Sequence, residues 1–226
     1  MTENAARTAR RSRIAVYPRA LPRSFYDRDT EIVARELLGA VLWCKTAAGV
    51  AVGRIVETEA YLGEHDGACH AAAGLTQRTR WLYGPPGIAY VYFIYGVHWC
   101  FNAVTRREGL PSAVLVRALE PVEGLPLMRR RRGASVHDRD LTNGPGKLCA
   151  ALGITGTFNG ARLDRPPLSI VRGEPVADAE VAVSARVGIR RAADWPLRWF
   201  VKGSPYVSRA PRMHSSRRRP TQAHAR

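Results

Sequence analysis

The sequence predicts one α+β domain, in which a mainly antiparallel, curved β-sheet is surrounded by helices and each end carries a disordered basic segment. A chain of 226 residues with 46% hydrophobic side chains is long enough to bury the core of a single domain. Short runs rich in Val, Ile and Leu, separated by Gly and Pro turns, indicate strands. The chain shows no internal repeat and no regular alternation of strand and helix, which disfavours a parallel sheet.

The first part of this domain is expected to hold one helix and a β-hairpin. Residues 25–38 carry apolar side chains at nearly helical spacing, and the pattern stops at Gly39, a residue type that commonly follows the last turn of a helix. Residues 40–45 and 50–62 are rich in Val, Leu and Ile and flank an Ala-Ala-Gly turn at 47–49. Two such runs around a Gly-containing turn are typical of a hairpin.

The rest of the domain is expected to contain further strands and two helices. A Gly-Pro-Pro-Gly turn at 84–87 precedes an extended strand over 89–95. The strand pattern returns at Val104 and over 113–119, and a helix is expected to start near Pro121 and run into the basic residues 129–132. A second helix over 146–152 and three short strands complete the set, at 168–171, 181–187 and 199–202.

Net positive charge is the first indication of a binding partner. The formal net charge is +16, and a surface that positive attracts polyanions such as nucleic acid. Residues 1–23 and 209–226 together supply +11 of this charge, which leaves +5 for the domain over 24–208. Segments with few apolar residues and many like charges do not fold alone, so we expect two disordered arms that add phosphate contacts. The alternative is that the arms are solvated and take no part in binding.

Membrane, disulfide and metal chemistry are all disfavoured. No stretch approaches the roughly 20 continuous apolar residues of a membrane helix, and the Arg-rich N-terminus is unlike a secretory signal, so we expect a cytoplasmic protein, nucleoid-associated if its source is bacterial. The four cysteines are far apart and are expected to be free and packed. His65 and His70 bracket Cys69, but no second ligand pair has zinc spacing, so we expect neither a metal nor a cofactor.

Two acidic residues stand out in the strand over 50–62. Alternate side chains of a strand share a face, so Glu57, Glu59 and Tyr61 lie on the same side. A buried carboxylate must be paired, hydrogen-bonded or used for function, because burial of a lone charge costs several kcal/mol. The alternative, a solvated outer face of the sheet, is the more common reason for acidic alternation.

Arg117 favours a buried, paired acid over a solvated outer face, because it lies inside the apolar run over 113–119. An arginine in such a strand needs an acidic partner, and Glu57 or Glu59 is the natural one. A guanidinium can orient a carboxylate and still keep donors free for a water or a phosphate. An ion pair that serves packing alone is the alternative.

Tyrosines form a third cluster. Five of the eight tyrosines fall between residues 61 and 95, and they are Tyr61, Tyr83, Tyr90, Tyr92 and Tyr95. Aromatic strand residues are usually core residues, which is the first interpretation for Tyr90 and Phe93. Phenol rings beside a carboxylate and a basic surface also suit the stacking of bases, and a bulky side chain at a turn can wedge into a base step.

Four segments resemble one known family. They are Arg54-Ile-Val-Glu-Thr-Glu-Ala-Tyr-Leu-Gly63, Tyr90-Val-Tyr-Phe-Ile-Tyr-Gly96, Val116-Arg-Ala-Leu-Glu-Pro121 and Thr142-Asn-Gly-Pro-Gly-Lys-Leu148. In this order the segments are similar to the alkyladenine (3-methyladenine) DNA glycosylases, and the likeness spans residues 24–208. Four ordered motifs are far more specific than any one of them.

The resemblance implies a catalytic group. Glu59 corresponds to the general base that activates the water attacking C1′ of the deoxyribose, and Arg117 corresponds to the arginine that helps to hold this water. A backbone carbonyl near Val187 corresponds to the third contact of the water. The residues alone do not choose between Glu57 and Glu59; the family motif makes that choice.

The resemblance also implies a pocket for an extruded base. Tyr61, His70 and Tyr92 correspond to the residues that sandwich the base, and Asn102 corresponds to the asparagine that discourages guanine. Tyr95 corresponds to the wedge that fills the gap in the base stack. The chain departs from the family at Val97, where Met is common, and at Leu82-Tyr83, where Met-Phe is usual, so lesion preference is left open.

The implied activity is base-excision repair. A monomeric glycosylase would flip alkylated or deaminated purines (3-methyladenine, 7-methylguanine, hypoxanthine and etheno-adenine) out of double-stranded DNA and hydrolyse the N-glycosidic bond. Lys45, Lys147 and Lys202 are the only lysines, and we expect none near the motifs to form a Schiff base, so the enzyme would leave an abasic site without cutting the strand. The alternatives are a non-catalytic nucleic-acid-binding protein and a hydrolase of free nucleosides.

Overall fold

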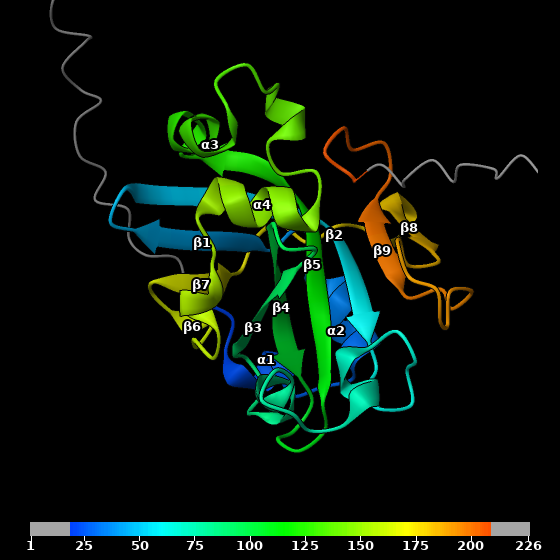
Figure 1. The fold of residues 1–226 in the computed structure, drawn as a ribbon. Helices are drawn as coiled ribbons and strands as arrows, with labels where there is room; N and C mark the ends of the chain where they lie inside the picture. The colour runs from blue at the N-terminus through cyan, green and yellow to red at the C-terminus, as the bar shows by residue number, and fades with distance from the viewer. Residues whose placement is uncertain (1–18, 209–226) are drawn as a thin grey trace, which may run out of the picture.

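A computed structural model describes residues 19–208 of the chain (Figure 1). Its helices are α1 (Arg23–Tyr26), α2 (Thr30–Glu36), α3 (Leu125–Arg132) and α4 (Pro145–Leu152). Its strands are β1 (Val41–Thr46), β2 (Gly49–Tyr61), β3 (Ala89–Ile94), β4 (His98–Thr105), β5 (Ser112–Glu123), β6 (Asp164–Arg165), β7 (Leu168–Val171), β8 (Val181–Ser184) and β9 (Arg198–Val201). Five short 3-10 helices lie between them, at His70–Ala73, Arg80–Tyr83, Asp138–Asp140, Gly156–Phe158 and Asp178–Glu180.

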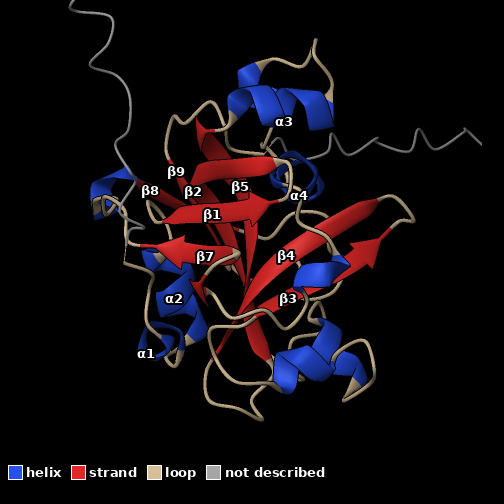
Figure 2. Ribbon diagram, turned by 90° about the vertical axis from the view of Figure 1, so that its left-hand side faces the viewer, coloured by secondary structure: helices blue, strands red, loops and turns tan. Residues whose placement is uncertain are grey.

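The strands form one antiparallel sheet, which curls into a half-barrel (Figure 2). Its strand order is β3-β4-β5-β2-β1-β7-β6, and β9 joins β2 while β8 extends β9. The two longest strands, β2 and β5, lie at the centre, and their pairing is irregular around Glu57. Such bulges bend and twist a strand, so the sheet curls at the position of the acidic residues. The predicted class, a single α+β domain with a curved antiparallel sheet and surrounding helices, is confirmed.

Helices pack the core against this sheet. Val33 and Leu37 are fully buried, and Thr58 of β2 donates a hydrogen bond of 2.9 Å to the carbonyl of Ala34 in α2. The helix α4 packs on β4 and β5, where Leu148 and Leu152 are fully buried. The site-bearing strands are therefore held between helices and are rigid supports.

The helix expected over 25–38 is wrong as one element, because it is divided into α1 and α2. The side chain of Asp29 accepts a 3.0 Å hydrogen bond from the N–H of Glu31 and so caps a new helix start. An N-cap residue has extended backbone geometry, which interrupts the helix before it. The apolar spacing across this break was therefore misleading.

The helix expected from Pro121 also starts later than predicted. The strand β5 runs on to Glu123, with Pro121 opposite Gly53 of β2. Gly124, at a φ of 83°, then turns the chain into α3. The proline within the first turn of α3 is Pro126, and Pro121 is tolerated near the end of its strand, where the pairing with β2 is irregular.

The two segments expected to be disordered lie largely outside the described residues. At the N-terminal end, the boundary expected at residue 23 differs from the structure, since Ala20 already bridges to Val171 and Leu21 is buried. All four cysteines are free and buried. Within residues 19–208, no helix is long and apolar enough to cross a membrane, and no His, Cys, Asp and Glu cluster suits a metal ion.

Candidate active site

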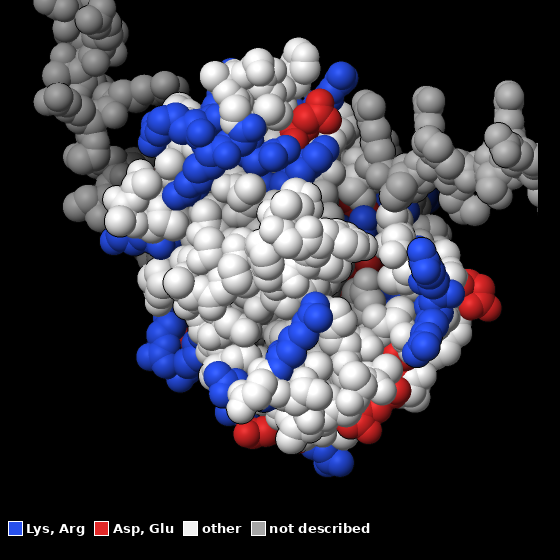
Figure 3. All heavy atoms as spheres, in the orientation of Figure 1, with Lys and Arg blue, Asp and Glu red and all other residues white. Residues whose placement is uncertain are grey.

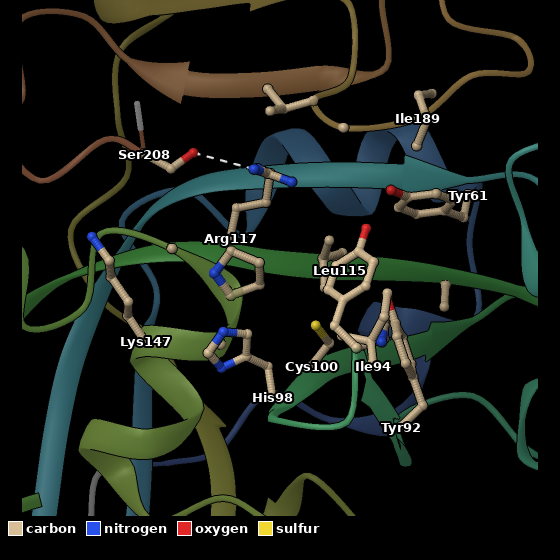
Figure 4. A pocket seen from close by; sticks show the side chains of 18 of the residues that line it. Tyr61, Tyr92, Ile94, His98, Cys100, Leu115, Arg117, Lys147, Ile189 and Ser208 are labelled. Carbon is tan, nitrogen blue, oxygen red and sulfur yellow. Dashed lines mark hydrogen bonds between the residues drawn. The ribbon is translucent and has the colours of Figure 1, made fainter. Parts of the chain in front are cut away.

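A pocket of about 660 Å³ opens between the sheet and α4 (Figure 4). Tyr61 and Tyr92 lie toward one end of it and Lys147 and His98 toward the other, with Arg117 on the wall between them. Its walls come from β2 to β5, from the N-terminus of α4 and from the loop after β8. A pocket of several hundred Å³ is the size that encloses a small organic ligand.

Glu57, Glu59 and Arg117 meet beneath this pocket. The Arg117 guanidinium contacts Glu57 through Nε at 3.1 Å and Glu59 through Nη1 at 3.2 Å. Both carboxylates are fully buried, and Arg117 is 7% exposed. The prediction that Arg117 pairs with one of the two acids is confirmed for both, and the alternative of a solvated acidic face is wrong.

Four hydrogen bonds hold Glu57. Its Oε1 accepts from Arg117 Nε at 3.1 Å, Arg198 Nε at 2.6 Å and Ser208 Oγ at 2.8 Å. Its Oε2 accepts from the N–H of Ser208 at 2.6 Å. Three of the four donors share Oε1, and Arg198 gives Glu57 a second arginine partner that Glu59 does not have.

Glu59 is held differently. Its Oε2 contacts Arg117 and accepts from Tyr61 Oη at 2.9 Å, whereas its Oε1 accepts from the N–H of Val187 at 2.7 Å. Three positions are used, and no described residue fills the second acceptor position of Oε1. Tyr61, Arg117 and Val187 line the pocket, and Glu59 lies directly behind them. The group of Val187 that contacts Glu59 is its amide N–H, whereas the group expected near Val187 to contact the water is a backbone carbonyl.

Burial sets the proton affinity of Glu59. It raises the pKa of the Glu59 carboxyl above its usual value, against the lowering effects of Arg117, the Val187 N–H and the Tyr61 hydroxyl. A carboxylate with a raised pKa is a stronger base than an exposed one. Glu59 therefore combines an unfilled acceptor position with increased basicity.

Aromatic rings line the end of the pocket at which Tyr61 lies. The His70 and Tyr92 rings meet edge to face at 4.4 Å, and His70 Nδ1 is 2.9 Å from Tyr90 Oη. Burial, and then the nearby Arg78, lower the pKa of His70 to about 4, so the ring is neutral at pH 7. Tyr90 is a core residue, as interpreted from the sequence, and it also lines the pocket.

The remaining predicted residues lie on the β3–β4 hairpin. Asn102 is buried in the pocket wall and donates 3.1 Å to the carbonyl of Tyr90, which fixes its amide. Tyr95 lies in the turn between the strands, at a φ of 55° and with 80% exposure. Its neighbours Phe93 and Val97 are also exposed, so the hairpin presents an apolar tip beside the pocket.

Three residues at or beside the site were not predicted from the sequence. Lys147 lines the pocket and donates 2.7 Å to Asn143 Oδ1, so the expectation that no lysine lies near the motifs is wrong. It lies in the first turns of α4 and within the segment Thr142–Leu148, one of the four that resemble the family, so this segment could have indicated its position. The buried pair Asp66 and Arg186 had no local signal at all.

Basic side chains gather beside α3, as Figure 3 shows for one face of the molecule. The last turn of α3 consists of Arg129, Arg130, Arg131 and Arg132, and Arg132 also lines the pocket. Arg131 is used internally, because it donates to Ala151 and Thr46. The described domain therefore carries positive charge next to the pocket as well as in the two arms.

Comparison with known proteins gives a consistent result. The family model described as methylpurine-DNA glycosylase matches residues 24–205. A Myxococcus xanthus protein named "Putative 3-methyladenine DNA glycosylase" is 51% identical over 194 residues, which cover 84% of this chain and 94% of the relative. Relatives of the same name from Carboxydothermus hydrogenoformans and Methanoculleus marisnigri are 46% and 50% identical over 84% of the chain and 98% of their own lengths.

Proposed function

The chain belongs to the methylpurine-DNA glycosylase family, and we propose that it hydrolyses the N-glycosidic bond of a damaged purine flipped out of duplex DNA, with Glu59 activating the water. As a member of this family, the protein is a DNA glycosylase that acts in DNA repair. The proposed substrates are 3-methyladenine, 7-methylguanine, hypoxanthine and etheno-adenine, and the proposed product is an abasic site. We expect it to act on DNA as a monomer.

One observation carries the assignment to Glu59. Glu57 and Glu59 share a strand face and an arginine, but the three groups that hold Glu59 all line the pocket, whereas Glu57 is also paired with Arg198, which does not line it. A water on Glu59 Oε1 would donate to the carboxylate and lose its proton to it as the C1′–N bond breaks. Positive charge develops on the sugar in this step, and the same carboxylate stabilises it.

The aromatic end of the pocket suits a flat, apolar base. Tyr61, Tyr92 and neutral His70 offer ring faces, and base stacking on aromatic side chains contributes about 1–3 kcal/mol per base. The hydrogen bond to Tyr90 fixes the Asn102 amide, which would face one edge of the bound base. Exclusion of bases with a bulky group at that edge is the proposed role of Asn102.

The pH dependence of the reaction should report Glu59. Hydrolysis requires the ionised carboxylate, so the single-turnover rate should fall in acid, with a midpoint above the usual value for glutamate because burial raises the pKa of Glu59. His70 has a pKa of about 4 and is already neutral at that point. Rates measured between about pH 4 and 9 check this; a rate that stays constant down to about pH 4 would contradict the role of Glu59.

Base flipping assigns a separate role to Tyr95. Truncation in Tyr95→Ala removes the wedge at the hairpin tip and should lower kcat/KM on a damaged duplex by about 10- to 100-fold, since a wedge offsets a few kcal/mol of unstacking. The matched control is Ile32→Ala, which truncates an exposed apolar side chain of α2, outside the pocket. An unchanged kcat/KM for Tyr95→Ala would exclude the wedge.

The proposed function is tested by a comparison of two substrates. A duplex with one hypoxanthine should release the base, whereas free inosine should not be hydrolysed, because flipping and phosphate contacts are missing. Equal turnover of both would favour the nucleoside hydrolase. Binding of the damaged duplex without release of any base would favour the non-catalytic binding protein.

The two basic arms have a proposed auxiliary role. They lie outside residues 19–208 apart from a few N-terminal positions, and their charge would add sequence-independent contacts to DNA phosphates. The basic turn of α3 provides similar charge within the domain. The arms would thus increase affinity for DNA without contributing to lesion choice.

A further inference from the structure

Asp66 and Arg186 form a fully buried ion pair beside the proposed catalytic group. Arg186 donates through Nη1 to Asp66 Oδ2 at 2.5 Å and through Nη2 to Asp66 Oδ1 at 2.8 Å, and both side chains are 0% exposed. They are 120 residues apart in the chain. Burial of two charges has a large desolvation cost, and Arg186 Nε also lacks a hydrogen-bond partner. A pair that costs this much is poorly explained by stability alone.

Arg186 reaches the strand that carries Glu59. Its Nη1 also donates 2.9 Å to the carbonyl of Ala60, and its guanidinium carbon lies 4.7 Å from the centre of the Tyr61 ring. Tyr61 Oη in turn donates to Glu59 at 2.9 Å. The guanidinium therefore fixes the backbone and the ring that hold one oxygen of the carboxylate.

Asp66 fixes the chain that follows this strand. Besides Arg186, it accepts from the N–H of Leu62 at 3.1 Å and of Ala68 at 3.0 Å. These bonds close the loop between Tyr61 and His70, which both line the pocket. Although burial alone would raise it, the Arg186 guanidinium and these N–H groups hold the pKa of Asp66 below its usual value, so the pair is ionised.

Arg186 also positions Val187, the next residue in the chain. The strand β8 ends at Ser184, so Val187 has no place in the sheet, and its N–H still donates 2.7 Å to Glu59 Oε1. The side chain of Arg186 anchors this loop to β2 and to the carbonyl of Ala192 at 3.4 Å. The pair thus connects the donors on both oxygens of Glu59.

We propose that Asp66 and Arg186 are a positioning pair, which sets the Tyr61 hydroxyl and the Val187 amide against Glu59 and so prepares this carboxylate for hydrolysis. The proposal rests on the proposed function of Glu59. The groups that face Glu59 are Arg117 of β5, Tyr61 and Glu57 of β2 and the Val187 amide. Asp66 and Arg186 control two of these groups without touching the carboxylate.

The test is Asp66→Asn, with Asp178→Asn as its matched control. Asp178 forms an exposed 2.5 Å pair with Arg35 away from the pocket. Asp66→Asn should lower the single-turnover rate by about 10- to 100-fold with little change in KM, because small displacements of catalytic groups have effects of this size. Weaker donation to Glu59 should also move the acid limb of the pH profile to higher pH. The control should match the wild type in the single-turnover rate, in KM and in the acid limb of the pH profile.

A second measurement separates this proposal from the proposed function. The carbon-13 shift of the Glu59 carboxyl, followed against pH, reports its proton affinity even if no base is released. A higher pKa of the Glu59 carboxyl in Asp66→Asn than in the wild type supports the pair as a positioning device, whatever the substrate. If Asp66→Asn only lowers the melting temperature, with the rate, KM and carboxyl titration unchanged, the pair is structural and the proposal is overturned.

Arg186→Lys keeps the test decisive if Asp66→Asn does not fold. Lysine retains the charge and one contact to Asp66, but it loses the planar fork that reaches Asp66, Ala60 and the Tyr61 ring together. It should reproduce the lower rate and the shifted titration in a folded protein. A folded Arg186→Lys with the wild-type rate and titration would overturn the proposal.

Discussion

Glu59→Gln is expected to lower release of a damaged purine by about 10²–10⁴-fold, the usual contribution of a general base. Glutamine keeps the size of the side chain and one carbonyl acceptor, but it cannot take a proton from the water on Oε1. Binding of the damaged duplex should survive, since the pocket rings and the basic surface are unaffected. Single-turnover base release and duplex affinity, measured side by side, check this.

The matched control for this variant is Glu36→Gln. Glu36 is an exposed residue at the end of α2 and pairs with Arg28 at 2.7 Å, outside the pocket. Its substitution should leave base release at the wild-type rate. Wild-type release by Glu59→Gln would remove Glu59 from the mechanism.

Glu59→Gln should not reduce stability at neutral pH. The pKa of Glu59 is raised in the folded protein, so its contribution to stability is fully present below the unfolded-state pKa and is lost as pH rises through the folded-state pKa. Glutamine is neutral at every pH, so the variant should be at least as stable as the wild type at pH 7. The difference should shrink toward zero in acid, which thermal unfolding at several pH values measures.

Glu57→Gln is expected to have the opposite effect, with a loss of about 3–5 kcal/mol in the free energy of unfolding. Glu57 neutralises Arg198 and shares Arg117, and it accepts both donors of Ser208. A neutral side chain would leave Arg198 buried without a carboxylate. Denaturant unfolding of the two variants compares them directly. A loss for Glu57→Gln below about 1 kcal/mol would show that this network does not stabilise the fold.

The fold could be predicted from the sequence where local patterns decide it. The β1–β2 hairpin and α4 were predicted within one or two residues, because apolar runs and Gly or Pro boundaries mark them. Patterns failed where one residue redirects the chain. Asp29 caps a new helix inside an apolar periodicity, and Gly124, rather than Pro121, ends the long strand.

The site could be predicted only in part, for a physical reason. Strand alternation brings Glu57 and Glu59 to one face and requires a partner such as Arg117, but it gives no count of hydrogen bonds on each carboxylate. The distinguishing contacts come from Ser208 and Val187, far along the chain. Asp66 and Arg186 are likewise paired only by the fold, so no local pattern indicates them.

The most direct test of the central claim is a product analysis on duplexes that each carry one damaged purine. Free base and abasic strand should form in equal amounts, and the strand should stay intact until alkali is added. Borohydride should trap no covalent complex, although Lys147 lies in the pocket. Failure to release a base from any of the four lesion duplexes would contradict hydrolysis in this pocket, and strand cleavage before alkali or a trapped complex would contradict attack by water.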